Sequence, residues 1–242
     1  MSQSKTFSEK NFDVIVPGQL WSVAHELRMI PWVYLPARMV VVRLDDASLA
    51  LHSPVPITDA MAAQIKALGT VKVIIAPNNY HHLYLKKVVA RYPEAEVWAA
   101  PGLPDKRKDM VLTNFFGETA SPSWADRLKP LFLAGAPKMD ETAFVHSATR
   151  SLIVTDSFFN LGSQSRGWLS PIIFRLTGAW KKPGQSKIWR SIVKDKAAMR
   201  ASTERLLAED FDRIIMAHGD IIETGGHAAY RKAAAWVLDG KA

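Results

Sequence analysis

Apolar and polar positions in the first half of the chain follow two patterns, one typical of strands and one typical of helices. The apolar runs Met39–Leu44 and Ser48–His52 flank a short polar turn and predict a β-hairpin. Thr58–Leu68 and His81–Arg91 instead space their apolar residues as on one face of a helix. The branched apolar run Val71–Ala76 between them predicts a buried strand. This order of strands and helices favours helices packed on a sheet.

The second half of the chain predicts shorter elements of the same two kinds. Residues 158–190 lack a strand-like pattern. The other segments predict strands at Glu96–Ala99, Leu131–Leu133, Thr142–His146, Ser151–Asp156 and Ile214–Ala217, and helices over Ser191–Leu207 and His227–Leu238.

Polar side chains follow three of the predicted strands at the point where each strand ends. One strand precedes His81 and His82, another ends at Asp156, and the last leads to His218. Because chemistry in α/β proteins gathers at the carboxyl ends of strands, we expect these four side chains to converge. Three imidazoles and one carboxylate suit a single Zn²⁺ or Fe²⁺ ion. A helix beginning at His81 would favour the neutral imidazole that a metal requires.

The same residues also have structural interpretations, which the sequence leaves open. Adjacent histidines can cap a helix, Asp156 can cap the segment after it, and His218 can be a turn residue. In the metal interpretation, a water deprotonated near neutral pH is the nucleophile. Asp156, Asn79 and Tyr80 are then the candidate catalytic residues, with Asn79 and Tyr80 orienting the substrate or supporting an oxyanion.

Composition limits the class of protein. The 242 residues can form one large domain or two small ones, and the 48% that are hydrophobic are enough to bury a sizeable core. The absence of cysteine excludes disulfides, thiolate metal ligands and a cysteine nucleophile. No stretch approaches the roughly 18 uncharged apolar residues of a membrane span, and the first residues lack the apolar core of a secretory signal. These observations favour a soluble, cytoplasmic protein.

The positive charge is concentrated in residues 162–200. This segment contains nine Lys or Arg and one acid, Asp195, so its net charge equals the +8 of the whole chain. Tryptophans and branched apolar residues are interleaved with the cations between Gly162 and Trp189. Two interpretations stay open, a mobile helical lid over the site and a weak peripheral contact with an anionic membrane. Either would attract a small anionic substrate, and the lack of a nucleic-acid-binding motif argues against a nucleic-acid partner.

Three sequence stretches together resemble the metallo-β-lactamase fold superfamily. They are APNNYHHLYL (76–85), YPEAEVWAAPGL (92–103) and LIVTDSFFNL (152–161), and within the superfamily they resemble the DUF4336 domains. The resemblance implies a mixed α/β (α+β) protein built as a four-layered αββα sandwich. It also implies a single domain over 19–240, after an N-terminal extension at 1–18, with a basic helical insert at about 160–200.

Carried over residue by residue, the resemblance implies at most one metal ion. The superfamily motif His-x-His-x-Asp-His, aligned on its last histidine, falls on Pro77, Asn79, His81 and His82, so its two leading histidines are missing. The next family histidine falls near residues 136–137, where none exists.

The second metal position of the superfamily keeps a full set of polar residues. These are His81, His82, Asp156 and His218. Two functions therefore stay open. One is a hydrolase-like enzyme with one zinc or iron ion, and the other is a metal-free, non-catalytic descendant that binds a small ligand or a partner.

Overall fold

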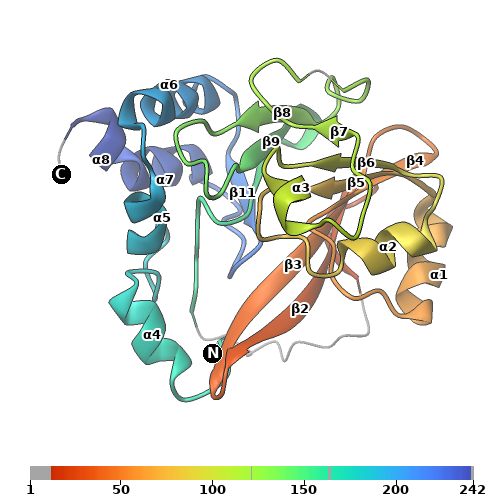
Figure 1. Ribbon diagram of the computed structural model, residues 1–242, viewed down its shortest axis with the longest axis horizontal. Coiled ribbons are helices and arrows are strands. Elements are labelled where there is room, and N and C mark those ends of the chain that lie inside the picture. The colour runs from red at the N-terminus through yellow and green to blue at the C-terminus, as the bar shows by residue number, and fades with distance from the viewer. Residues whose placement is uncertain (1–11, 121, 163–164, 241–242) are drawn as a thin grey trace.

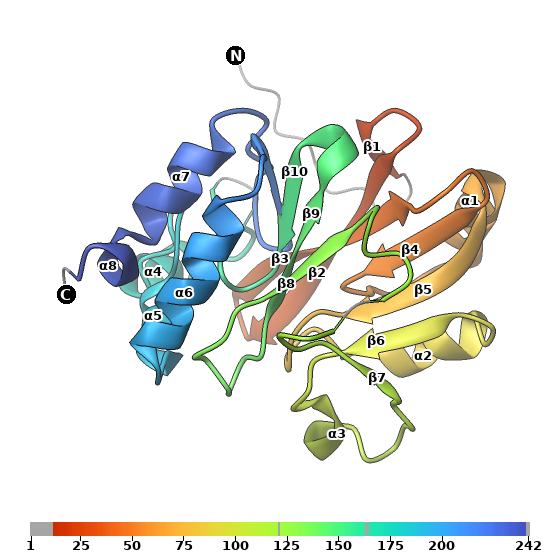
Figure 2. The same ribbon diagram turned by 90° about the horizontal axis from the view of Figure 1, so that it is seen from above.

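The computed structural model describes residues 12–120, 122–162 and 165–240. Two β-sheets pack face to face, and helices cover the outer side of each (Figures 1 and 2). This is the four-layered mixed α/β sandwich expected from the sequence. No helix in the described part of the chain is long and apolar enough to cross a membrane.

The first sheet has seven strands whose spatial order follows their order in the chain. Strands β1 to β4 pair with one another in antiparallel fashion, and β4 to β7 pair with one another in parallel. The strands are β1 (Asp13–Val16), β2 (Leu20–Ile30), β3 (Val33–Arg43), β4 (Ser48–His52), β5 (Thr70–Ala76), β6 (Glu96–Ala99) and β7 (Asn114–Phe115).

The second sheet has four strands in the order β11-β10-β9-β8. The central strands β9 and β10 form the expected antiparallel pair, and β11 joins β10 in parallel. The strands are β8 (Lys129–Phe132), β9 (Thr142–His146), β10 (Ser151–Val154) and β11 (Arg213–Met216).

The helices divide between the two outer faces. Buried side chains of α1 (Asp59–Leu68), α2 (Leu85–Arg91) and α3 (Leu103–Lys106) belong to the core beneath the first sheet. The second sheet and the region beside it carry α4 (Ser170–Leu176), α5 (Lys187–Ile192), α6 (Lys196–Leu207), α7 (Gly226–Ala233) and α8 (Ala235–Leu238).

Alternation along the strands builds the layers. In β10, Leu152 and Val154 face the helices, while Ile153 packs between the sheets with Val40 and Ile75 of the first sheet. Successive side chains of a strand point to opposite faces, so a strand covered on both sides is apolar at every position. This explains the continuous apolar runs at residues 73–76 of β5 and 152–154 of β10.

Two sequence-based boundaries differ from the structure. Helix α2 begins at Leu85 and not at His81, so the prediction of a helix N-terminus under the histidines is wrong. The side-chain oxygen of Asn78 accepts the backbone N–H groups of Tyr80 and His81 over 2.8 and 2.9 Å, and residues 81–84 form a turn between this contact and the helix. Strand β1 lies within the expected N-terminal extension, residues 1–18, and pairs with β2. The part of this extension that forms β1 therefore belongs to the first sheet.

The long β2–β3 hairpin extends beyond the rest of the first sheet and receives α4 against its tip (Figure 1). The backbone N–H of Tyr34 donates to Ser170 Oγ over 3.0 Å. Gly167 has φ +84°, and a Cβ there would stand 2.2 Å from the carbonyl oxygen of Trp32. Only glycine fits this close approach, so the glycine at the start of the basic segment fixes where the segment meets the hairpin.

Candidate metal centre

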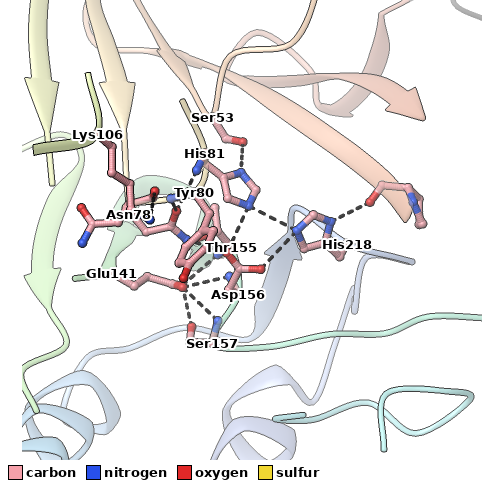
Figure 3. Close-up of polar contacts among 12 residues, drawn as sticks. Ser53, Asn78, Tyr80, His81, Lys106, Glu141, Thr155, Asp156, Ser157 and His218 are labelled. Carbon is pink, nitrogen blue, oxygen red and sulfur yellow. Dashed lines mark hydrogen bonds and ion pairs between the residues drawn. The ribbon is translucent and has the colours of Figure 1, made fainter. Parts of the chain in front are cut away.

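Three side chains meet at one edge of the sandwich: His81, Asp156 and His218 (Figure 3). The Nε2 atoms of His81 and His218 lie 3.2 Å apart. The Asp156 carboxylate places Oδ2 3.3 Å from Nε2 of His81 and Oδ1 3.3 Å from Nε2 of His218. Three of the four predicted ligands therefore converge.

Each of these residues follows the carboxyl end of a different strand. His81 lies in the turn after β5, in the first sheet. Asp156 and His218 follow β10 and β11, which are parallel neighbours in the second sheet. The cluster consequently bridges the two sheets, and its geometry depends on how they pack.

A hydrogen bond on the far side of the ring fixes the tautomer of neutral His218, and another one is compatible with the same tautomer in His81. His218 Nδ1 lies 2.7 Å from the carbonyl oxygen of Pro36, which can only accept, so Nδ1 carries the proton. Ser53 Oγ lies 2.6 Å from His81 Nδ1 and can accept the proton there. In the neutral form both Nε2 atoms then present lone pairs toward Asp156, which is the tautomer that binds a metal.

The spacing of the donor atoms fits a metal ion. Ligand atoms about 2.0–2.1 Å from a tetrahedral zinc lie about 3.3 Å from one another. Each of the three contacts here has that length, and Asp156 offers a different oxygen to each histidine. Without a cation, two imidazole lone pairs and a carboxylate would face one another at 3.2–3.3 Å with no donor between them. A single shared proton satisfies one of these contacts, whereas a metal ion satisfies all three.

Asp156 is held in place from behind by Asn78. Asn78 Nδ2 donates to Asp156 Oδ2 over 2.7 Å and to Thr155 Oγ1 over 2.9 Å. Burial alone would raise the pKa of Asp156, but the positive charge and the hydrogen bonds that His81 and His218 supply when protonated outweigh it and hold that pKa well below its usual range. Asp156 is therefore a carboxylate in the neutral pH range.

A second, buried carboxylate, Glu141, anchors the backbone that carries Asp156 (Figure 3). Its oxygens accept the backbone N–H groups of Thr155, Asp156 and Ser157 over 2.9–3.0 Å, and the Ser157 hydroxyl over 2.7 Å. Burial and the nearby Asp156 raise the pKa of Glu141, while these donors oppose the shift. Glu141 thus positions the loop without contacting the cluster's open side.

The structure does not bring His82 into the cluster. Its backbone carbonyl accepts Arg107 Nη1 over 2.6 Å, and the same nitrogen lies 3.5 Å from its ring Nδ1. Partial burial lowers the pKa of His82, and the cations Arg107 and Lys106 add to that shift.

Asn79 and Tyr80 separate in space despite being adjacent in sequence. Asn79 is buried, and its side-chain nitrogen donates to Asp140 Oδ2 over 3.1 Å, away from the cluster. Tyr80 is half exposed, lines the cavity beside His81, and carries Lys106 Nζ 3.7 Å from its ring centre. Of the two, only Tyr80 faces the space where a substrate would bind.

The cluster opens into a cavity of about 550 Å³. Described residues of the basic segment form one wall of this cavity, through Ile173 and Phe174 of α4 and Ile188 and Trp189 of α5. The segment therefore lies on the same side of the molecule as Asp156, where a lid was expected.

The two packed sheets, with a histidine–aspartate cluster where their strands end, define a metallo-β-lactamase fold. The sequence profile of the family described as "Domain of unknown function (DUF4336)" matches residues 17–167. The chain therefore belongs to the DUF4336 family. This matched region contains His81 and Asp156 but ends before His218.

Solved structures share this fold at low sequence identity. A structure of VMB-1 matches with a TM-score of 0.66 and 10% identity, covering 97% of this chain and 100% of that chain. A metallo-β-lactamase from Pontibacter korlensis matches with a TM-score of 0.63 and 11% identity, covering 96% and 99%. The mono-zinc form of FIM-1 from Pseudomonas aeruginosa matches with a TM-score of 0.62 and 13% identity, covering 97% and 95%. No curated protein sequence matches this chain.

Sequence reasoning did not identify several residues that support the cluster. Ser53 has a positive φ of 58°, which is unusual for a residue with a side chain and places its hydroxyl against His81. Pro36 acts through its backbone carbonyl, and Glu141 through contacts with a loop. None of these carries a local sequence signal, and Glu141 lies between the polar residues Asp140 and Thr142.

Proposed function

We propose that this protein is a metal-dependent, hydrolase-like enzyme that binds one divalent ion, Zn²⁺ or Fe²⁺, through His81, Asp156 and His218. The observation that carries the proposal is that the two histidine Nε2 atoms lie 3.2 Å from each other and each lies 3.3 Å from one oxygen of the Asp156 carboxylate. Three protein ligands with a free position are typical of catalytic zinc sites, and two histidines with one carboxylate are typical of non-haem iron sites.

The residues around the ligands have distinct roles in this proposal. Ser53 and the Pro36 carbonyl hold the two imidazoles in the ligating tautomer, and Asn78 fixes the orientation of the Asp156 carboxylate. A bound divalent ion would supply Lewis acidity and make water a nucleophile near neutral pH. Tyr80 is the candidate residue for contacting the substrate, since it lines the cavity next to His81.

The catalytic role expected for Asn79 has no support in its contacts, because its side chain binds Asp140. Asp156 keeps the role of metal ligand. We infer no role for His82 in ligation, since Arg107 occupies its side of the turn.

Elemental analysis of the purified protein and of matched variants tests the proposal. We expect about one equivalent of zinc or iron in the wild type, and loss of that metal in H81A and H218A. The control is H82A, which removes the adjacent histidine and should retain the metal. Equal metal content in all four proteins would overturn the assignment of His81 and His218 as ligands.

A metal-free binding protein is the alternative. It is favoured by the absence of histidine at Pro77 and Asn79, where the superfamily motif has its two leading ligands. In that case protons would have to relieve the repulsion among His81, Asp156 and His218. A wild-type protein that takes up no divalent ion, even when refolded in excess zinc or iron(II), would establish this alternative.

A further inference from the structure

The cavity beside the cluster is apolar along almost its entire length. The hairpin contributes Met29, Ile30 and Leu35, and the basic segment contributes Phe174, Ile188 and Trp189. The ionisable side chains of the lining lie at the cluster and in the turn that carries His81, and the hydroxyls of Thr177 and Ser186 in the basic segment are bonded to the Phe174 carbonyl and the Trp189 N–H. A ligand that fills this space must therefore be polar at one end only.

Strongly polar ligands fit this cavity poorly. Hydroxyl or amide groups placed along the hairpin and α4 would lose their water without finding partners, and each would cost about 1–3 kcal/mol. A volume of about 550 Å³ is in the range of small-molecule sites. A hydrocarbon chain fills such a space with no unpaired polar group.

The charges near the polar end favour an anionic head group. Tyr80 and His82 line the cavity, and a cation lies behind each of them. Lys106 Nζ lies over the ring of Tyr80 and donates to the carbonyl of Asn79, and Arg107 binds the carbonyl of His82. Among the described lining residues, Asp156 is the only carboxylate, and it already faces the two histidines. An anionic group near Tyr80 therefore meets a cation and no unpaired acid.

We propose that the ligand of this site is an amphiphilic anion with an unbranched hydrocarbon chain, such as a medium-chain acyl compound. The chain lies between the β2–β3 hairpin and helices α4 and α5, and the charged end lies at the cluster and Lys106. This inference rests on the proposed function only for any reaction at the head group, because burial of the chain requires no metal.

Calorimetric titration with sodium hexanoate, octanoate, decanoate and dodecanoate, each below its micelle concentration, tests the proposal. Each added methylene should tighten binding roughly fourfold until the cavity is filled. Affinity that does not depend on chain length would overturn it.

Matched aspartate substitutions distinguish the cavity from general surfactant adsorption. Ile188 lines the cavity yet is 56% exposed, so I188D should fold and weaken decanoate binding about tenfold or more. Val111 is 91% exposed and lies outside the cavity, so V111D should bind as the wild type does. Equal effects of the two substitutions would mean adsorption to the surface.

The head-group part of the proposal has its own comparison. Decanoate should bind more tightly than 1-decanol, and the difference should shrink in K106Q. No preference for the anion would remove the role assigned to Lys106.

A final variant separates this inference from the proposed function. H218A should lose the metal but keep the dependence of affinity on chain length. A wild-type protein that binds no metal, but whose affinity for carboxylates still increases with chain length, would reject the metal function and retain the amphiphile site. A metal-loaded wild type without chain-length dependence would do the reverse.

Discussion

The ring nitrogen Nδ1 of His218 donates a hydrogen bond to the backbone carbonyl of Pro36, 182 residues earlier in the chain, over 2.7 Å. Strand β4 pairs with β3 only from Val40 onward, so the edge of β3 at Pro36 is not covered by β4. The carbonyl at this open edge sets the tautomer of a histidine from the other sheet. A backbone group thus determines which nitrogen of His218 is available to a metal.

Ser53 permits a paired test of support for the metal site. S53A and S53G both remove the hydroxyl beside His81 Nδ1, and both should weaken metal binding about 10–100-fold. Their folding stabilities should differ, because the φ of 58° is strained for alanine but not for glycine. We expect S53G to be more stable than S53A by about 1 kcal/mol in urea unfolding. Chelator competition measures the affinities, and unchanged affinity in both variants would contradict the role of Ser53.

Replacing Glu141 should destabilise the whole domain. The amide of E141Q would direct an N–H₂ group at some of the four donors that the carboxylate now accepts. We expect a loss of about 3 kcal/mol in the free energy of unfolding. The control is E118Q, whose carboxylate is exposed and lies 3.8 Å from Arg205, and which should change stability by less than about 0.5 kcal/mol. Similar losses in both variants would contradict the anchoring role.

His52 should make the protein sensitive to acid. Its ring is buried against Phe144, neither ring nitrogen has a hydrogen-bond partner among the described residues, and burial lowers its pKa from 6.5 to about 3. The unfolded chain therefore binds one proton more between these pH values. Stability should fall as the pH decreases from about 6.5 to about 3, by up to about 1.4 kcal/mol per pH unit from this residue.

The variant H52L tests this origin of the pH dependence. It removes a buried polar group without a partner, so at pH 5 it should be more stable than the wild type by about 2 kcal/mol. Urea unfolding across the pH range measures both proteins, and an unchanged slope in H52L would contradict the prediction.

We expect no second metal ion close to the first. Pro77 has no ligating side chain, and the Asn79 side chain is bound to Asp140. Native mass spectrometry after dialysis should detect one metal ion per chain at most. Two ions per chain would require ligands other than those identified here.

The hairpin tip and α4 form a surface that should bind anionic membranes weakly. Trp32, Trp168 and Leu176 are 59%, 66% and 71% exposed, and Gly167 packs directly on the backbone of Trp32. Co-sedimentation with anionic liposomes should decrease as salt is added, because screening shortens to about 3 Å at 1 M. W32S/W168S should sediment less than the wild type, with V111S as the control. Binding that ignores lipid charge would leave no electrostatic role for the basic segment.

The sequence predicts the sandwich and most of the cluster because these depend on local patterns. Strands buried on both faces appear as continuous apolar runs, and each donor side chain follows such a run within a few residues. His81, Asp156 and His218 could therefore be found without knowing how the sheets pack. The side chain of His82 could not be placed in the same way, because neighbouring residues of an irregular turn have no fixed periodicity.

The residues that support the cluster could not be predicted because they act across long separations. Ser53 is 28 residues from His81 in the sequence, and its contact requires β4 and β5 to be parallel neighbours. The carbonyl of Pro36 is identical in the sequence to any other backbone carbonyl. Glu141 accepts from a loop whose path depends on the register of β9 and β10. Tertiary packing alone brings these groups together.

Strand β11 has a consequence for the order of events during synthesis. It is an edge strand of the second sheet, it is made after α4, α5 and α6, and it carries His218 at its end. A nascent chain that has not yet emerged beyond residue 212 has only two of the three donors. In the proposed metal site, a cation that needs all three donors would bind only after both sheets have formed and docked, so the growing chain would not take up metal before it has folded.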